Sequence, residues 1–145
     1  MRVVLQRVLE AGVAVDGAEI GSIGRGLLIF LGVSATDAPE LADNMIDKIA
    51  KLRIFPDSDG KSNLSISDIG GEVLVVSQFT LYADTKKGNR PSFTQAAPPD
   101  LAEELYEYFV SRCRGRFAKV ATGAFGADMK VRLVNDGPYT ILLEI

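Results

Sequence analysis

A short polar stretch, SQFTLYA at residues 77–83, directly follows a strongly apolar run and is the first candidate for chemistry. Ser77, Gln78 and Thr80 are costly to bury unless their polar groups are hydrogen-bonded. One interpretation is a pocket rim in which Thr80 offers a hydroxyl. The backbone N–H groups of Gln78 and Phe79, if unpaired where the strand ends, would then face a developing oxyanion. The alternative is an ordinary strand end with satisfied hydroxyls.

A polar loop at residues 83–99 follows and carries three cations close together. Lys86, Lys87 and Arg90 lie in its segment KKGNRPSF. Structureless loops of this length are uncommon in compact domains and are often functional. A phosphate-contacting loop would give salt-dependent nucleic-acid binding, whereas a merely solvated loop is the alternative. The net charge of −3 gives no overall nucleic-acid signature, so any basic face is local.

Two glycine-containing stretches near the end of the chain carry further candidates. GAFGADM, at residues 123–129, is a turn whose Phe125 either packs against the protein or offers a platform for stacking a base. NDGPYT, at residues 135–140, is a hairpin-turn signal even without its proline. Pro138 removes a backbone donor at the mouth of the next strand, which a simple hairpin does not require.

The chain has no histidine and a single cysteine, Cys113. Ser-His-Asp and Cys-His catalysis, His-ligated zinc, internal disulfides and cysteine-cluster metal sites are therefore excluded. Motif-like segments at 21–26, 57–60 and 60–62 lack the context of a dinucleotide, calcium or P-loop site. Chemistry must use carboxylates, hydroxyls, lysine, backbone N–H groups or groups of the substrate.

The hydrophobic pattern predicts one α+β domain over residues 1–145, with a curved, mostly antiparallel, barrel-like sheet and two helices packed against it. Asp16-Gly17 should turn the first strand into a partner at residues 18–23. The apolar run at 27–33 suits a strand covered on both faces. A buried strand is expected from Glu72 to about Leu81, and the last two strands at 131–134 and 139–145 should form a hairpin.

Two amphipathic helices are expected, at residues 37–52 and 100–113. Each begins with a D-x-x-E variant of the capping box, with Asp37 capping the first helix and Asp100 capping the second. No apolar run is long enough for a membrane span, and no signal peptide is expected. The lone cysteine suits a reducing cytosol.

Five stretches, in this order and spacing, resemble the D-aminoacyl-tRNA deacylases, also called D-tyrosyl-tRNA(Tyr) deacylases. They are QRV near the start, SQFTLYA, KKGNRPSF, GAFGADM and NDGPYT. Any one of them alone is weak, but five in register are specific. The resemblance runs from Met1 to Ile145.

The resemblance implies an activity and its partners. It implies a cytosolic homodimer that hydrolyses the ester between a D-amino acid and the terminal adenosine of tRNA. Glycine mischarged on tRNA(Ala) is implied as a second substrate. The active sites are expected at the subunit interface, with aminoacyl-tRNA as partner and without a metal, a cofactor or a membrane.

The resemblance also implies roles for particular residues. The stretch Ser77–Thr80 would form the active-site wall. Gly137-Pro138 would have a cis peptide bond, enter the partner's pocket and exclude an L-side chain, and Arg7 would help to hold it. Phe125 and Met129 would lie near the terminal adenosine.

Two positions depart from the family's common pattern. Tyr139 follows the proline where valine is common, and Ser62 stands where methionine is common in GKMN. Both leave the stretch at 77–80 intact, so they bear on the fine shape of the pocket and on the subclass.

The residues themselves favour positioning over side-chain catalysis. Without histidine, Thr80 has no obvious group to activate it, although a threonine nucleophile stays open. Oxyanion stabilisation, with the substrate's own 2′-hydroxyl assisting water, suffices for an activated ester. A non-catalytic RNA-binding domain of the same fold is the alternative, and a metal-dependent hydrolase with oxygen ligands is a third interpretation.

Overall fold

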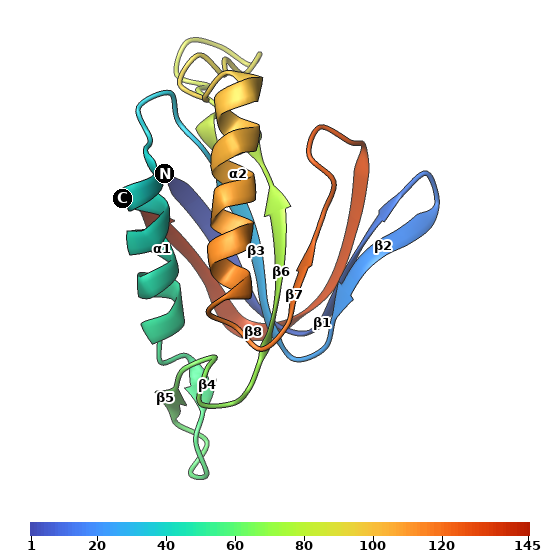
Figure 1. Ribbon diagram of the computed structural model, residues 1–145, viewed down its shortest axis with the longest axis vertical. Coiled ribbons are helices and arrows are strands. Elements are labelled where there is room, and N and C mark those ends of the chain that lie inside the picture. Colours follow the sequence, from blue (N-terminus) through green and yellow to red (C-terminus); the bar gives the residue numbers. More distant parts are fainter.

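A long, bent strand, β1 (Arg2–Val15), organises the sheet because three other strands pair with it. All three neighbours are antiparallel: β2 (Ala18–Ile23), β3 (Gly26–Gly32) and β8 (Met129–Glu144). The computed structural model, which describes residues 1–145, places β3 along the first half of β1 and β2 along the second half (Figure 1).

The sheet continues beyond β3 with parallel pairs. β3 pairs with β6 (Glu72–Ser77), and β6 pairs with β7 (Val120–Thr122). The strand order is β2-β1-β3-β6-β7, with β8 on the other side of β1, and it curls into a nearly closed, barrel-like sheet. A separate small hairpin pairs β4 (Phe55–Pro56) with β5 (Ser62–Leu64).

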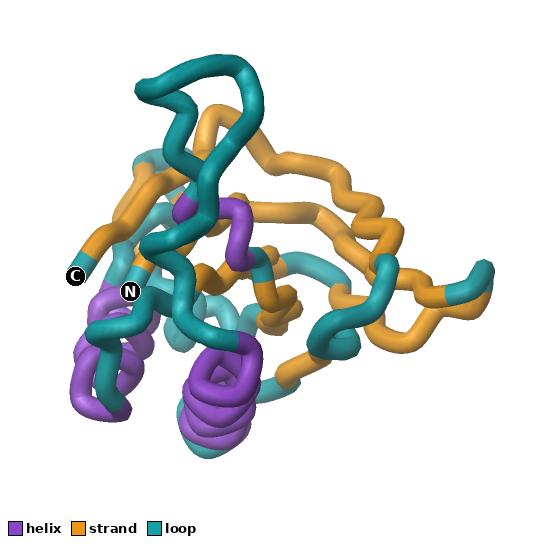
Figure 2. Tube along the Cα trace, turned by 90° about the horizontal axis from the view of Figure 1, so that it is seen from above, coloured by secondary structure: helices purple, strands orange, loops and turns teal.

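Both helices, α1 (Pro39–Lys51) and α2 (Pro99–Arg114), lie on the same side of the sheet (Figure 2). β3 is buried on both faces, as its apolar run predicts. Leu27, Ile29 and Leu31 point into the main core beneath the helices, whereas Leu28 joins a second core inside the curl of the sheet. The predicted α+β class is confirmed. Neither helix combines the length and apolarity needed to cross a membrane.

The capping boxes are wrong, although both helices are present. α1 begins at Pro39 with Ala38 as N-cap and without a side-chain cap, because the Asp37 carboxylate accepts hydrogen bonds from the Met1 ammonium at 2.7 Å and from Ser34. α2 begins at Pro99, where proline suits the first helical position. Asp100 therefore lies inside the first turn, where its negative charge still interacts favourably with the helix dipole.

Two strand predictions are also wrong. β6 ends at Ser77, and the chain then forms a 3₁₀ turn, η1 (Phe79–Tyr82), instead of continuing to Leu81. The C-terminal hairpin does not form, since β8 is one strand from Met129 to Glu144. Both halves of β8 pair with β1, so long-range pairing overrides the local turn signal.

Candidate active site

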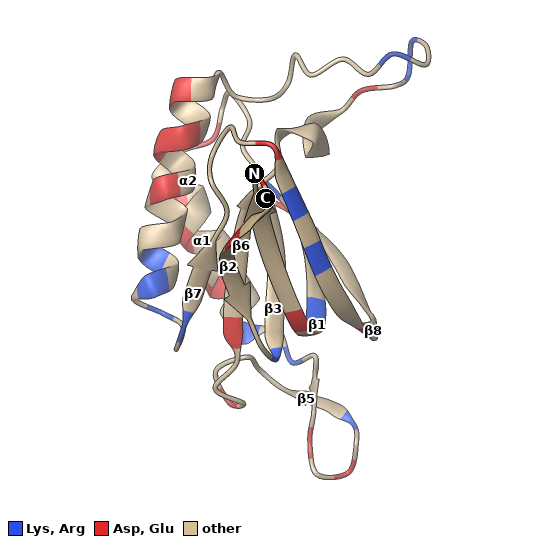
Figure 3. Cartoon of the chain, turned by 90° about the vertical axis from the view of Figure 1, so that its right-hand side faces the viewer, with Lys and Arg blue, Asp and Glu red and all other residues tan.

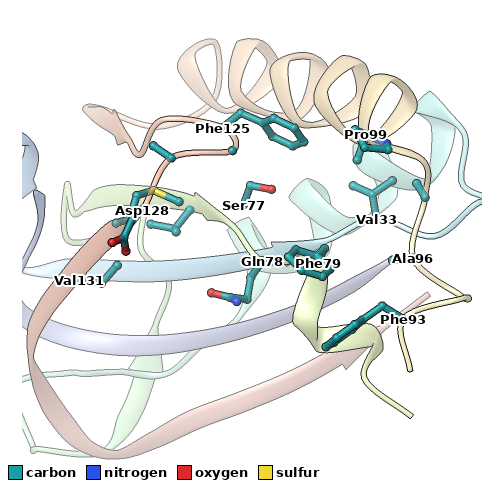
Figure 4. Close-up of a pocket in the computed structure, with 16 residues that line it drawn as sticks. Val33, Ser77, Gln78, Phe79, Phe93, Ala96, Pro99, Phe125, Asp128 and Val131 are labelled. Atoms are coloured by element: carbon teal, nitrogen blue, oxygen red, sulfur yellow. The ribbon is translucent and has the colours of Figure 1, made fainter. Parts of the chain in front are cut away.

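An apolar pocket of about 580 Å³ opens at the carboxyl ends of the parallel strands β3 and β6 (Figure 4). Crevices at the carboxyl ends of parallel strands are common ligand sites. Eleven of its sixteen lining residues are hydrophobic, so the pocket recognises shape more than charge. The lining residues are Val33, Val76, Ser77, Gln78, Phe79, Phe93, Ala96, Ala97, Pro99, Ala102, Phe125, Gly126, Ala127, Asp128, Met129 and Val131.

The predicted stretch at 77–80 reaches this pocket, but not all of its residues line it. Ser77 ends β6, and its side chain points toward the space below Phe125, whereas Gln78 points the other way. Thr80 is exposed and is not a lining residue. Its hydroxyl accepts a hydrogen bond from Gln78 Nε2 at 2.5 Å, so the two polar side chains satisfy each other.

One of the two expected oxyanion donors is already used. The backbone N–H of Gln78 donates to the carbonyl of Leu31 at 2.8 Å, which extends the parallel pairing by one residue. The expectation of a free N–H at Gln78 is therefore wrong. Phe79, the first residue of η1, carries the remaining donor of the pair.

Aromatic rings form two walls of the pocket. Phe79 meets Phe93 edge-on, with ring centroids 5.0 Å apart and planes at 67°. Phe125 packs on Tyr106 with centroids 6.0 Å apart. Tyr106 is buried and donates from its hydroxyl to the Val75 carbonyl, and burial raises its pKa to about 12. Phe125 therefore lies on a firmly held ring.

Charged chemistry is scarce in this pocket. Asp128 is the single ionisable lining residue, and it is exposed and paired with Lys130 at 2.6 Å. Met129, the other predicted residue on this side, starts β8 and lines the wall. The pocket can thus enclose an apolar group, but its side chains offer little acid–base chemistry.

The basic loop lies beside the pocket. Asp84 and Ser92 pair through two backbone hydrogen bonds of 2.8 and 2.9 Å, which close the loop tip at residues 85–91. The predicted phosphate-contacting cations Lys86, Lys87 and Arg90 lie on this tip, are exposed and form no ion pair. Figure 3 shows the tip extending from the body of the protein, with basic residues (blue) at its end.

Gly137 and Pro138 lie elsewhere, in a bulge of β8. Two steps along β1, from Gln6 to Val8, are matched by five steps along β8, from Thr140 to Asn135. We call residues 136–138 the β8 bulge. Its Gly137-Pro138 peptide bond is cis, and both residues are exposed and absent from the pocket lining. A bulge accommodates a proline because no ladder N–H is needed there.

Arg7 holds the β8 bulge from inside. Its side chain is buried, and its guanidinium donates to the carbonyl of Asp136 at 3.2 Å, to that of Gly137 at 3.3 Å and to that of Ile54. It also forms an ion pair with the Asp136 carboxylate at 2.9 Å. The structure therefore brings Arg7 together with Gly137, as the resemblance implies, but not with the pocket of the same chain.

Sequence reasoning missed several pocket residues. Val33, Ala96, Ala97, Pro99 and Ala102 are small or apolar and come from separate segments, so no local pattern marks them. Phe93 could have been found, because it is the one aromatic residue in a basic, polar loop.

Comparisons with known proteins agree with this architecture. The profile of the D-Tyr-tRNA(Tyr) deacylase family matches residues 4–144. The chain belongs to that family. D-aminoacyl-tRNA deacylases that resemble it include one from Thermotoga petrophila, 58% identical over 99% of this chain and 97% of the relative. Another, from Variovorax paradoxus, is 57% identical over 100% of this chain and 99% of the relative.

Two solved structures share the fold. One, described as a c-Myc DNA Unwinding Element Binding Protein, superposes with a TM-score of 0.95 at 42% identity, covering 100% of this chain and 99% of that one. The other, a probable eukaryotic D-amino acid tRNA deacylase, has a TM-score of 0.86 at 19% identity over 99% and 98%, and so supports the fold alone.

Proposed function

We propose that this protein hydrolyses the ester bond of D-aminoacyl-tRNA and of glycyl-tRNA mischarged on tRNA(Ala). The observation that carries the proposal is the apolar pocket lined by Ser77, Phe79, Phe125 and Met129 in a chain of the deacylase family. The whole of residues 1–145 acts as one domain, without a cofactor or metal. The reaction takes place in the cytoplasm, where aminoacyl-tRNA is used.

The substrate's 3′ end enters along the basic tip. Lys86, Lys87 and Arg90 neutralise tRNA phosphates outside the pocket, where solvent exposure leaves them free to do so. The terminal adenosine stacks at Phe125, whose ring rests on Tyr106, and Met129 fills the space beside it. The ester carbonyl then reaches the wall at residues 77–79.

The chemical step uses backbone and substrate groups. Water attacks the ester carbonyl with help from the ribose 2′-hydroxyl, and the N–H of Phe79 stabilises the oxyanion that forms. Collapse of the intermediate breaks the bond to the ribose oxygen, which takes up the proton that the attacking water loses, and releases the free D-amino acid and tRNA. Ser77 orients the ester from the pocket side. Thr80 braces Gln78 and is not the nucleophile.

Selection between D- and L-substrates comes from the β8 bulge of a second copy. Gly137 and Pro138 are exposed and lie outside their own pocket, so they can only meet a substrate bound to another subunit. In a homodimer with active sites at the interface, the bulge carbonyls engage the α-amino side of the substrate. The space for an L-side chain is then filled, whereas a D-side chain or glycine is accepted.

The direct test incubates the protein with D-tyrosyl-tRNA, L-tyrosyl-tRNA and glycyl-tRNA(Ala). We expect hydrolysis of the first and third and protection of the second. If neither the D-tyrosyl ester nor the glycyl ester is cleaved, the proposed activity is refuted. Equal cleavage of the D and L esters would instead refute selection by the bulge.

A second candidate is nucleic-acid binding without chemistry. One observation favours it, namely the 42% identical structure described as a DNA unwinding element binding protein. The exposed basic tip would serve either function, but an apolar pocket beside it has no role in plain binding. Tight binding of uncharged tRNA or DNA together with no ester hydrolysis would support this candidate.

A further inference from the structure

Two residues far apart in the sequence, Tyr139 and Ser62, are in direct contact. The hydroxyl of Tyr139 donates a hydrogen bond to Ser62 Oγ, although the residues are 77 positions apart. Ser62 begins β5, and Tyr139 directly follows the β8 bulge. The contact therefore joins the β4–β5 hairpin to the segment that carries Gly137 and Pro138.

The ring of Tyr139 also covers Arg7. The guanidinium carbon lies 4.5 Å from the ring centroid, in the arrangement of a cation–π contact. The N–H groups of the Arg7 guanidinium donate hydrogen bonds to the carbonyls of Asp136, Gly137 and Ile54. Tyr139 thus closes the face of a cation whose N–H groups are already directed at the bulge.

The hairpin and the bulge are joined at two points. Arg7 reaches the carbonyl of Ile54, just before β4, and Tyr139 reaches Ser62 on β5. Asn135 fixes the backbone on the other side, since its Nδ2 donates to the carbonyls of Arg7 at 3.0 Å and of Tyr139 at 3.1 Å. The Gly137 carbonyl is consequently held by a braced frame and has little freedom to shift.

We propose that Tyr139 and Ser62 are positioning residues for selection between D- and L-substrates. Ser62 anchors the Tyr139 hydroxyl, the Tyr139 ring fixes the plane of the Arg7 guanidinium, and Arg7 sets the position of the Gly137 carbonyl. A frame that holds this carbonyl to a fraction of an ångström excludes an L-side chain, whereas a loose one lets the substrate push it aside. The inference rests on the proposed role of the bulge in selection.

The test compares four variants with a matched control. Tyr139→Val removes both contacts, Tyr139→Phe keeps the ring over Arg7 but loses the hydroxyl, and Ser62→Ala removes the acceptor; the fourth combines Ser62→Ala with Tyr139→Phe. Tyr108→Phe is the control, because it removes a hydroxyl bonded to Asp43 between the two helices, away from the bulge. For each protein, kcat and KM are measured with D- and L-tyrosyl-tRNA, and Tm by thermal unfolding.

We expect Tyr139→Val to lower the ratio of D to L kcat/KM by about tenfold or more, through faster L-ester hydrolysis. Tyr139→Phe and Ser62→Ala should each lower the ratio by a smaller, similar factor, and the double variant by no more than either single one, because they break one shared contact. Tyr108→Phe should leave the ratio unchanged even if its Tm falls.

Three outcomes would overturn the inference. An unchanged ratio of D to L kcat/KM in Tyr139→Val, together with a lowered Tm, would mean that Tyr139 only stabilises the fold. If the wild type is selective in the same experiment, the proposed function is unaffected by that result. Multiplying effects of Ser62→Ala and Tyr139→Phe would show that they act separately. A wild type that cleaves neither ester would refute the proposed function and this role with it.

A spectroscopic readout separates the frame from the activity. The Arg7 guanidinium carbon lies 4.5 Å from the centroid of the Tyr139 ring, so the NMR signals of the guanidinium group should be shifted by the ring current. Tyr139→Val should abolish that shift and Tyr139→Phe should retain it. Retention of the shift in Tyr139→Val would contradict the stacked geometry.

Discussion

The pocket at the ends of β3 and β6 keeps its shape by apolar packing, whereas the β8 bulge is held by hydrogen bonds around one buried cation. The pocket is concave and has a single, exposed ionisable group, Asp128. The bulge exposes Gly137 and Pro138, and Arg7 donates hydrogen bonds to the carbonyls of Asp136 and Gly137. Rigidity therefore comes from side-chain volume in one region and from polar geometry in the other.

This difference has a functional meaning. A pocket lined mainly by apolar side chains binds by shape more than by charge. A backbone surface that is fixed by a buried guanidinium can exclude by position without recognising a side chain. In the proposed function, substrate binding belongs to the pocket and exclusion of the L-substrate to the bulge of a second subunit, and the following predictions test that division.

The largest effect should come from one backbone donor in the pocket. Phe79→Pro removes the N–H assigned to the oxyanion at the first position of η1, where proline fits the backbone. We expect kcat to fall by about 10²–10³. Phe79→Ala is the control, since it loses the contact with Phe93 but keeps the N–H. Equal losses of kcat in the two variants, measured in single turnovers, would assign the effect to the ring.

The second prediction tests whether pocket and bulge act from different subunits. Ala127→Trp should fill the pocket, and Pro138→Ala should alter the bulge, so each variant alone should lack selective hydrolysis of D-tyrosyl-tRNA. A heterodimer of the two still has one intact pocket facing one intact bulge. In a two-fold symmetric dimer, equal mixing after unfolding and refolding should place half of the intact pockets opposite an intact bulge, so L-ester hydrolysis per intact pocket should fall to about half of that in Pro138→Ala alone.

A mixture whose L-ester hydrolysis per intact pocket equals that of Pro138→Ala alone would contradict the division, provided that the heterodimer forms. Its formation is followed with an affinity tag on one variant only. Wild-type chains refolded in the same way give the reference activity. Full activity of Pro138→Ala alone, with the D/L ratio of the wild type, would also remove the bulge from selection.

Some parts of these regions could be predicted from the sequence better than others. Features set by local patterns were predictable, whereas features set by contacts between distant segments were not. The apolar run of β3 and the amphipathic helices were predictable because their patterns are local. The hairpin expected at Asn135–Gly137 failed because pairing of β8 with β1 decides the backbone there. Asp37 could not be recognised as a partner of Met1, since that contact exists only after the sheet and α1 have formed.

The site shows the same limit. The stretch at 77–80 marked the pocket because polar residues after a buried strand need an explanation. The small residues that complete its wall, such as Ala97 and Ala102, carry no such signal. Arg7 and Gly137 are far apart in sequence, and only the resemblance to the family joined them before the structure did.

A moderate effect is expected outside both regions, on the basic tip. The triple variant Lys86→Ala, Lys87→Ala, Arg90→Ala should weaken tRNA binding and raise KM, with kcat unchanged. The slope of the logarithm of the binding constant against the logarithm of the salt concentration is negative, and it should become shallower by about 2 to 3, as expected for the loss of three phosphate contacts. Lys48→Ala with Lys51→Ala on α1 is the control. A changed D/L ratio in the triple variant would mean that the tip also shapes the pocket.

Thr80→Ala should have a small effect. Thr80 is exposed and lies outside the pocket lining, so we expect activity within about tenfold of wild type, whereas loss of a nucleophile can cost about 10⁶. Ser77→Ala, which removes the hydroxyl that points into the pocket, should cost more. A near-complete loss in Thr80→Ala, without a change of Tm, would restore threonine as nucleophile.

The smallest effect concerns pH, because no histidine is present and the lining of the pocket has a single ionisable residue, Asp128. The chain has no histidine, and burial raises the pKa of Tyr106 and of the Cys113 thiol to about 12, so both stay protonated in the neutral range. Between about pH 6 and 8, kcat/KM should therefore change only with the substrate's own α-amino group and spontaneous hydrolysis. Profiles of wild type and Asp128→Asn should coincide. A bell-shaped profile that Asp128→Asn flattens would instead identify Asp128 as an acid or base in the pocket.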